Sequence, residues 1–329
     1  MRRLIPLLLL ILLALGAACG GGDDDSASSS PTRKPSATST RGSRTPTAAP
    51  TPIVSGGPTV SVTPRSTQQP VFLTPTRAPT PTPTPNPNAK LYIALGDSLS
   101  YGHGASDRST TAWVPLVKSG LGGGWSLSNL GVPGYTSGDL LSRGQMDAAV
   151  SQINARKNDG IAGNEVGAIT LEIGGNDLLE IYEDLVLTGT CPSVPESLPK
   201  PECVDRLREA LLEFTPNLQK AVDRLQGAAP GVPIFMATLY NPFSGGSVNL
   251  DGIGALALEG QADTPFATGL NDAIRAVAQE KGAYLVEWYA PFLGKVNEYI
   301  AQDLIHPNDT GHAVMAQAVL AAMAQAGVD

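Results

Sequence analysis

The chain has 329 residues, with 22 Lys and Arg against 30 Asp and Glu and a formal net charge of −8 at pH 7. Residues 31–88 hold 14 of the 28 prolines, six basic residues and no acidic residue, whereas residues 89–329 hold 27 acidic and 14 basic residues. Because nucleic-acid binding relies on clustered cations, the acidic second part excludes nucleic acid as the leading candidate partner.

The first 18 residues have the pattern of an export signal. A cationic start at residues 1–3 precedes twelve mainly apolar residues, Leu4–Leu15. That run is shorter than the about 20 residues that a helix needs to cross a bilayer, and it suits the apolar core of a secretory signal. Small residues then lead to Cys19, which resembles the bacterial lipoprotein signal, although that family prefers a larger aliphatic residue at Gly16.

The lipoprotein resemblance implies a mature chain that begins with an acylated Cys19 and is anchored by lipid at the cell surface, outside the cytoplasm. A secreted protein without lipid is the alternative if Cys19 is not acylated. Residues 19–88 are expected to form a disordered tether, because they contain almost no large apolar residues, and their Thr-Pro alternation favours an extended, semi-rigid spacer. Residues 89–329 are long enough for one well-cored domain.

Short apolar runs alternate with helix-like stretches through this domain. Such alternation predicts a parallel sheet with helices on both faces. One helix-like stretch contains Pro216, which is expected to kink it. The expected strands are 91–95, 125–130, 166–173, 232–238 and 283–287, and the expected helices are 137–156, 204–225, 264–281 and 310–325.

Short segments rich in glycine and polar residues, here called polar blocks, follow several of these strands. They should meet at one edge of the sheet. A serine needs a base to become nucleophilic, and Asp303 lies three positions before His306, close enough to fix the ring tautomer. Ser98, His306 and Asp303 are therefore predicted to be nucleophile, base and orienting acid. The predicted donors to a developing oxyanion are the backbone N–H groups of Ser98 and Gly131 and the side-chain amide of Asn176.

The four blocks, in this order, resemble the SGNH/GDSL hydrolase family. Ser98 stands in Gly-Asp-Ser-Leu, Gly131 in the second block, Asn176 in Gly-Gly-Asn-Asp, and Asp303 with His306 in Asp-x-x-His-Pro. The resemblance spans residues 91 to about 324. It implies a three-layer α/β/α flavodoxin-like sandwich with a central five-stranded parallel sheet, and serine esterase or lipase activity without a metal or other cofactor.

Two functions remain open at this point. The first is an exported, lipid-anchored serine hydrolase of carboxylic esters, and the alternative is a catalytically inactive cell-surface binding lipoprotein on the same fold. Within the enzyme hypothesis, a lysophospholipase and a short-chain or glycan O-acyl esterase both fit. Small acyl groups are slightly favoured, because no extended exposed apolar stretch is visible. The oligomeric state is open, with a monomer as the default expectation.

Cys191 and Cys203 lie in a proline-rich stretch, residues 185–204, that looks like an insertion near the site. In an exported protein such a pair is expected to form a disulfide, with two free thiols as the alternative. Neither cysteine has a neighbouring histidine, so a zinc site or a catalytic thiol is not expected.

Four further polar residues are not assigned to catalysis. Asp97 should bond its own loop, and His312 should support the last helix. His103 is expected to face solvent, with substrate contact as the alternative. Glu172 lies inside a strand-like run, and if it is buried it needs a partner that the sequence does not identify.

Overall fold

The computed structural model describes residues 86–329, so the predicted signal, Cys19 and nearly all of the predicted tether lie outside the described residues. Five strands form one sheet, and every neighbouring pair is parallel. Their order across the sheet is β2-β1-β3-β4-β5. The strands are β1 (Lys90–Leu95), β2 (Trp125–Asn129), β3 (Val166–Leu171), β4 (Ile234–Ala237) and β5 (Tyr284–Val286).

The helices of the described residues differ widely in length. They are α2 (Ser98–Tyr101), α3 (Trp113–Leu121), α4 (Ser137–Ser142), α5 (Gln145–Asn158), α6 (Gly175–Ile181), the π-helix η1 (Tyr182–Val186), α7 (Val194–Ser197), α8 (Pro201–Ala228), α9 (Val248–Glu259), α10 (Leu270–Lys281), α11 (Tyr289–Phe292), α12 (Val296–Tyr299) and α13 (Asp309–Gln325).

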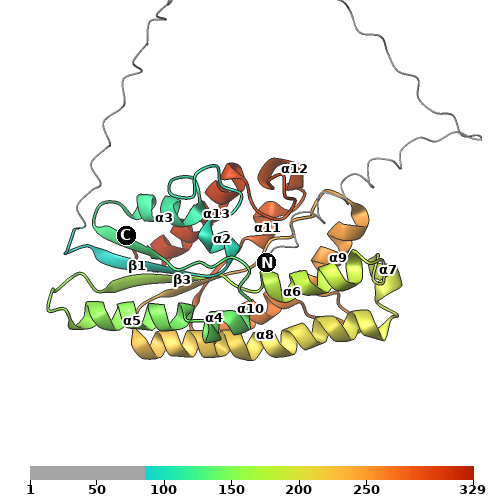
Figure 1. Cartoon of the computed structure of the whole chain (residues 1–329), viewed down its shortest axis with the longest axis horizontal. Coiled ribbons are helices and arrows are strands. Elements are labelled where there is room, and N and C mark those ends of the chain that lie inside the picture. The colour runs from blue at the N-terminus through green and yellow to red at the C-terminus, as the bar shows by residue number, and fades with distance from the viewer. Residues whose placement is uncertain (1–85) are drawn as a thin grey trace, which may run out of the picture. The chain divides into compact units, whose positions relative to one another are not determined.

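Helices cover both faces of the sheet. On one face α3 packs against α13, and on the other α8 packs against α4, α5 and α10 (Figure 1). Strand β3 lies in the middle of the sheet, and the residues of its neighbour β1 from Leu91 to Leu95 are buried. The expected three-layer α/β/α sandwich with a central five-stranded parallel sheet is confirmed.

Three expected helices differ from the observed ones. The stretch 137–156 forms two helices, α4 and α5, because Gly144 between them adopts a left-handed backbone (φ 90°) that interrupts the helix. Helix α10 begins only at Leu270, and α8 continues through Pro216. Helix α9 was not expected, since Gly252 and Gly254 inside it disfavour a helix in the sequence.

A small hydrophobic core lies apart from the main core of the sheet, and we call it the second core. It joins the end of α6, the first turns of α8 and the last turns of α9, and it includes a residue of the loop before α10. Its buried members are Ile181, Val204, Leu207, Leu256, Ala257 and Phe266. The predicted disulfide between Cys191 and Cys203 is present, and it ties the loop after η1 to the first turn of α8.

Reduction of the Cys191–Cys203 bond is expected to loosen residues 182–203 and leave the sheet folded. In the chain-entropy model a closed loop of about a dozen residues adds about 3 kcal/mol, and this loop packs on the second core. Hydrogen exchange with and without a reductant should show faster exchange within 182–203 and unchanged protection in β1 and β3. Simultaneous loss of protection in those strands would contradict the prediction, as would finding both thiols alkylated in the unreduced protein.

Candidate active site

The first polar block forms a tight junction between β1 and α2. The Asp97 carboxylate accepts a hydrogen bond from the Leu99 N–H at 3.0 Å and caps α2, whose first residue is Ser98. Gly96, just before the cap, has φ 153°, and a Cβ there would collide with the backbone and carboxyl group of Glu172. A glycine is therefore required where the chain turns from β1 to present Ser98.

Ser98, His306 and Asp303 form a continuous hydrogen-bonded chain. The Ser98 Oγ lies 2.8 Å from Nε2 of His306, and Nδ1 of the same ring lies 2.7 Å from Oδ2 of Asp303. The other carboxylate oxygen of Asp303 accepts the backbone N–H groups of Ile305 at 3.1 Å and His306 at 3.0 Å. Leu304, inside this turn, has a left-handed backbone with φ 64°.

The charge of Asp303 is stabilised by this turn. Partial burial alone would raise the pKa of Asp303, but the hydrogen bonds from the ring and backbone of His306 lower it below its ordinary value. An ionised Asp303 that accepts the proton of Nδ1 leaves Nε2 of His306 as the acceptor for the Ser98 hydroxyl. The geometry can therefore draw the proton from a serine that attacks a carbonyl carbon.

The three predicted oxyanion donors differ in whether they already have a hydrogen-bond acceptor in the protein. The Asn176 amide donates both of its hydrogens, to Asp97 Oδ2 at 3.0 Å and to the Tyr135 carbonyl at 2.9 Å. The Gly131 N–H donates to Asn129 Oδ1 at 3.0 Å. Within the described residues no protein acceptor is found for the N–H of Ser98.

Gly131 lies directly behind the serine helix. A Cβ at this position would come within 2.5 Å of the Tyr101 nitrogen and 2.7 Å of the Ser100 carbonyl carbon. The missing side chain therefore allows the loop after β2 to contact the backbone of α2. Any residue with a Cβ at position 131 would push this loop away from α2.

Two histidines near the site have different environments. His312 is buried, its Nδ1 accepts the Trp113 N–H at 3.3 Å, and its Nε2–H donates to the His103 carbonyl at 2.9 Å. Burial lowers its pKa to about 4, so it is a neutral structural residue as expected. His103, which was expected to face solvent, is partly exposed, and its ring lies edge-on against the His306 ring with centroids 5.0 Å apart.

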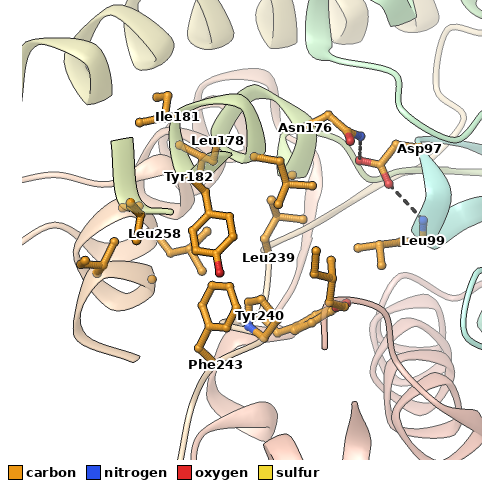
Figure 2. A pocket seen from close by; sticks show the side chains of 18 of the residues that line it. Asp97, Leu99, Asn176, Leu178, Ile181, Tyr182, Leu239, Tyr240, Phe243 and Leu258 are labelled. Carbon is orange, nitrogen blue, oxygen red and sulfur yellow. Dashed lines mark hydrogen bonds between the residues drawn. The ribbon is translucent and has the colours of Figure 1, made fainter. Parts of the chain in front are cut away.

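An apolar pocket opens beside this hydrogen-bonded chain. Ser98 and His306 are part of its lining, and it holds about 870 Å³ of space including its open mouth. Figure 2 shows side chains from α6, η1, α9 and the loop after β4 around it. The apolar side chains of its lining are Leu99, Leu178, Leu179, Ile181, Tyr182, Val186, Leu207, Leu239, Tyr240, Pro242, Phe243, Ile253, Ala257, Leu258 and Ile305.

One aromatic pair joins the two sides of this pocket. The Tyr182 ring on η1 stacks on the Phe243 ring from the loop after β4, with centroids 5.2 Å apart. Sequence reasoning missed the pocket because its lining comes from segments between residues 97 and 306 that are far apart in the chain.

Within residues 86–329 no group of three or more His, Cys, Asp or Glu side chains could hold a metal ion. No helix in the same part of the chain is both long and apolar enough to cross a membrane.

Comparison with known proteins places these features in a family. The model of the GDSL-like lipase/acylhydrolase family matches residues 94–314, whereas no curated protein sequence matches the chain. The lipase Lip_vut3 from a goat rumen metagenome is a similar solved structure, with 21% identity and a TM-score of 0.49 over 71% of this chain and 97% of its own. An extracellular lipase from Streptomyces rimosus has 21% identity and a TM-score of 0.48 over 72% and 100%.

A phospholipase A1 from Streptomyces albidoflavus NA297 has 19% identity and a TM-score of 0.48, over 72% of this chain and 99% of its own. The family model covers about two thirds of the chain and includes all four polar blocks completely. This chain therefore belongs to the GDSL-like lipase/acylhydrolase family and is a serine carboxylic ester hydrolase.

Proposed function

We propose that this enzyme cleaves carboxylic esters through Ser98, His306 and Asp303, and that it prefers esters of apolar acyl chains. One observation carries the proposal: the hydrogen-bonded chain from Ser98 Oγ to the Asp303 carboxylate lies at an apolar pocket. Because the hydrogen bonds from Ser98 through His306 to Asp303 are intact, the alternative of an inactive binding protein on the same fold is disfavoured.

The proposed reaction has two halves. Ser98 Oγ attacks the ester carbonyl carbon while Nε2 of His306 takes its proton, and Asp303 holds the ring and stabilises its positive charge. His306 then protonates the leaving alcohol, and the acyl group stays on Ser98. A water molecule, deprotonated by His306, attacks the acyl group and releases the carboxylic acid and the free serine.

The oxyanion formed in each half needs hydrogen-bond donors, and we assign the N–H groups of Ser98 and Gly131 and the Asn176 amide to this role. The Ser98 N–H has no competing protein acceptor within the described residues. Asn176 and Gly131 have acceptors in the free enzyme, Tyr135 and Asn129, which they exchange for the oxyanion when it forms. Because the hydrogen bond gained is to a charged oxygen, the exchange favours the transition state over the free enzyme.

The pocket supports a longer acyl chain than the small group that the sequence favoured. Most of its lining is aliphatic or aromatic, which suits a hydrocarbon chain and offers few partners to the hydroxyl groups of a glycan. Each methylene removed from water contributes about 0.8 kcal/mol, or about a fourfold gain in kcat/KM, until the pocket is full.

A series of 4-nitrophenyl esters from two to sixteen carbons tests the acyl preference. We expect kcat/KM to rise at least about tenfold between acetyl and octanoyl esters. Ala257→Phe, which adds a ring to the buried pocket wall on α9, should lower kcat/KM for octanoate at least about tenfold and spare acetate.

The matched control is Leu212→Phe, which adds a ring at an exposed position of α8 outside the pocket and should leave the chain-length profile unchanged. Equal kcat/KM values along the whole ester series would contradict the acyl-chain assignment. They would leave the roles of Ser98 and His306 untouched.

We further propose that the enzyme is exported and anchored by lipid at Cys19, which lies outside the described residues. The short apolar run before Cys19 supports this, and two or more acyl chains are needed for stable membrane attachment. Wild-type protein should incorporate labelled fatty acid and sediment with membranes, and Cys19→Ser should do neither. A wild-type protein without label would instead support secretion in soluble form.

A further inference from the structure

Two carboxyl groups are buried together behind the serine. Asp97 is 2% exposed and Glu172 is 1% exposed. Glu172 directly follows β3, and its N–H donates to the Leu95 carbonyl of β1 at 3.1 Å, so its position is set by the sheet. No Lys or Arg side chain within the described residues forms an ion pair with either group.

The contacts of Glu172 use only part of its carboxyl group. The Ser100 hydroxyl donates to Oε2 at 2.9 Å, whereas the buried Oε1 has no hydrogen-bond partner among the described residues. The carboxyl group of Glu172 lies against Gly96, the residue before Asp97, and the negative charge of Asp97 acts on it. A hydrogen bond between two carboxyl groups needs a proton on one of them, which is then the donor.

Asp97 is suited to be the acceptor. Its Oδ1 already accepts the Leu99 N–H, and its Oδ2 accepts the Asn176 amide at 3.0 Å (Figure 2), two bonds that favour the ionised form. Burial together with the negative charge of Asp97 raises the pKa of Glu172 well above its ordinary value. Burial also raises the pKa of Asp97, to about 6. At neutral pH Glu172 is therefore the neutral partner.

We propose that Glu172 is a positioning residue: its neutral carboxyl group donates to Asp97, and through Asp97 it holds the Asn176 amide in the orientation that an oxyanion donor needs. The inference rests on the oxyanion role proposed above for Asn176. It also gives Asp97 a second task besides capping α2. The other titratable groups that act on this pair are His306, Asp177 and Tyr240.

The test compares two replacements of Glu172 with the ester that wild type turns over best. Glu172→Gln keeps a neutral donor toward Asp97 and an acceptor for Ser100, and it should retain kcat within about threefold. Glu172→Met has a similar length but no donor, and it should lower kcat at least about tenfold with KM changed less than about twofold, since only transition-state stabilisation is lost.

A double-mutant cycle with Asn176→Ala identifies the route of the effect. If Glu172 acts through Asn176, Glu172→Met should cost less than about threefold in the Asn176→Ala background. The matched control is Thr170→Val on β3, the strand that Glu172 follows. This variant removes the buried hydrogen bond between Thr170 and Tyr92, and it should lower thermal stability while leaving kcat unchanged.

The pH dependence gives a second measurement that needs only the conservative variant, in case Glu172→Met does not fold. Because a neutral side chain replaces a neutral one, the pH–rate profile of Glu172→Gln should have its midpoint within about 0.3 pH units of wild type. A shift of about one unit or more would mean that Glu172 is charged in the native enzyme, and the proposal would be wrong.

The outcomes separate this inference from the proposed mechanism. Full additivity in the cycle, or a Glu172→Gln variant as impaired as Glu172→Met, overturns the positioning role and leaves the mechanism in place. An Asn176→Ala variant with wild-type kcat overturns both the oxyanion assignment and the inference that rests on it.

Discussion

Ser98→Ala is expected to lower kcat at least about 10⁴-fold and to leave the fold unchanged. The Ser98 hydroxyl provides the attacking oxygen in the proposed mechanism, and no other hydroxyl in the described residues is hydrogen-bonded to Nε2 of His306. Binding and oxyanion stabilisation alone leave only a small residual rate when a nucleophile of this type is removed. Ester hydrolysis measured with extensively purified protein, together with fluorophosphonate labelling of the serine, checks the prediction.

The stability of the variant can be anticipated from the same contacts. The Ser98 hydroxyl makes one side-chain hydrogen bond, to His306, so its loss should change the free energy of unfolding by about 1 kcal/mol or less. Ser142→Ala, at an exposed serine of α4 that bonds only the Gly138 carbonyl, is the matched control and should keep both activity and labelling. Wild-type turnover by purified Ser98→Ala protein would mean that the nucleophile lies elsewhere.

Asn176→Ala is expected to lower kcat about 10²- to 10³-fold with a smaller effect on KM. The amide is assigned to the oxyanion, which exists only in the transition state and in the intermediates, so substrate binding should change little. In the free wild-type enzyme the same amide donates to the Tyr135 carbonyl, and the variant also loses this hydrogen bond. Steady-state kinetics with the preferred ester, read as separate kcat and KM values, checks this.

A control of the same residue type is available on α8. The Asn217 amide donates to the Ser137 hydroxyl at 3.2 Å, and Asn217 is not part of the pocket lining. Asn217→Ala should therefore keep kcat within about twofold. If Asn176→Ala raised KM as strongly as it lowered kcat, its amide would bind the substrate rather than the oxyanion.

The sheet could be predicted from the sequence because buried parallel strands are continuous apolar runs bounded by glycine and polar residues. β1 and β3 have this form, and the blocks after them, with Ser98 and Asn176, were expected at one edge for the same topological reason. The pairing of Asp303 with His306 was also predictable, because three positions in a turn is a local distance.

Features that depend on contacts between distant segments could not be predicted in the same way. Helix α9 has two glycines in its sequence, and it is stabilised by packing in the second core rather than by the helix propensity of its residues. The pocket had no sequence signal because no single segment of it is unusually apolar. The proposed link from Glu172 through Asp97 to Asn176 joins the end of β3, the cap of α2 and helix α6, and no sequence motif indicates it.

The second core has a consequence for how this enzyme can change over evolutionary time. Ile181, Leu207 and Ala257 belong both to that core and to the pocket lining, whereas the strands that position Ser98 pack in the main core. A substitution at one of these three positions therefore reshapes the pocket from the smaller core, whereas Leu99, Leu239, Tyr240 and Leu258 of the lining belong to the main core. Acyl preference can drift between descendants of this sequence while the hydrolytic centre is inherited intact.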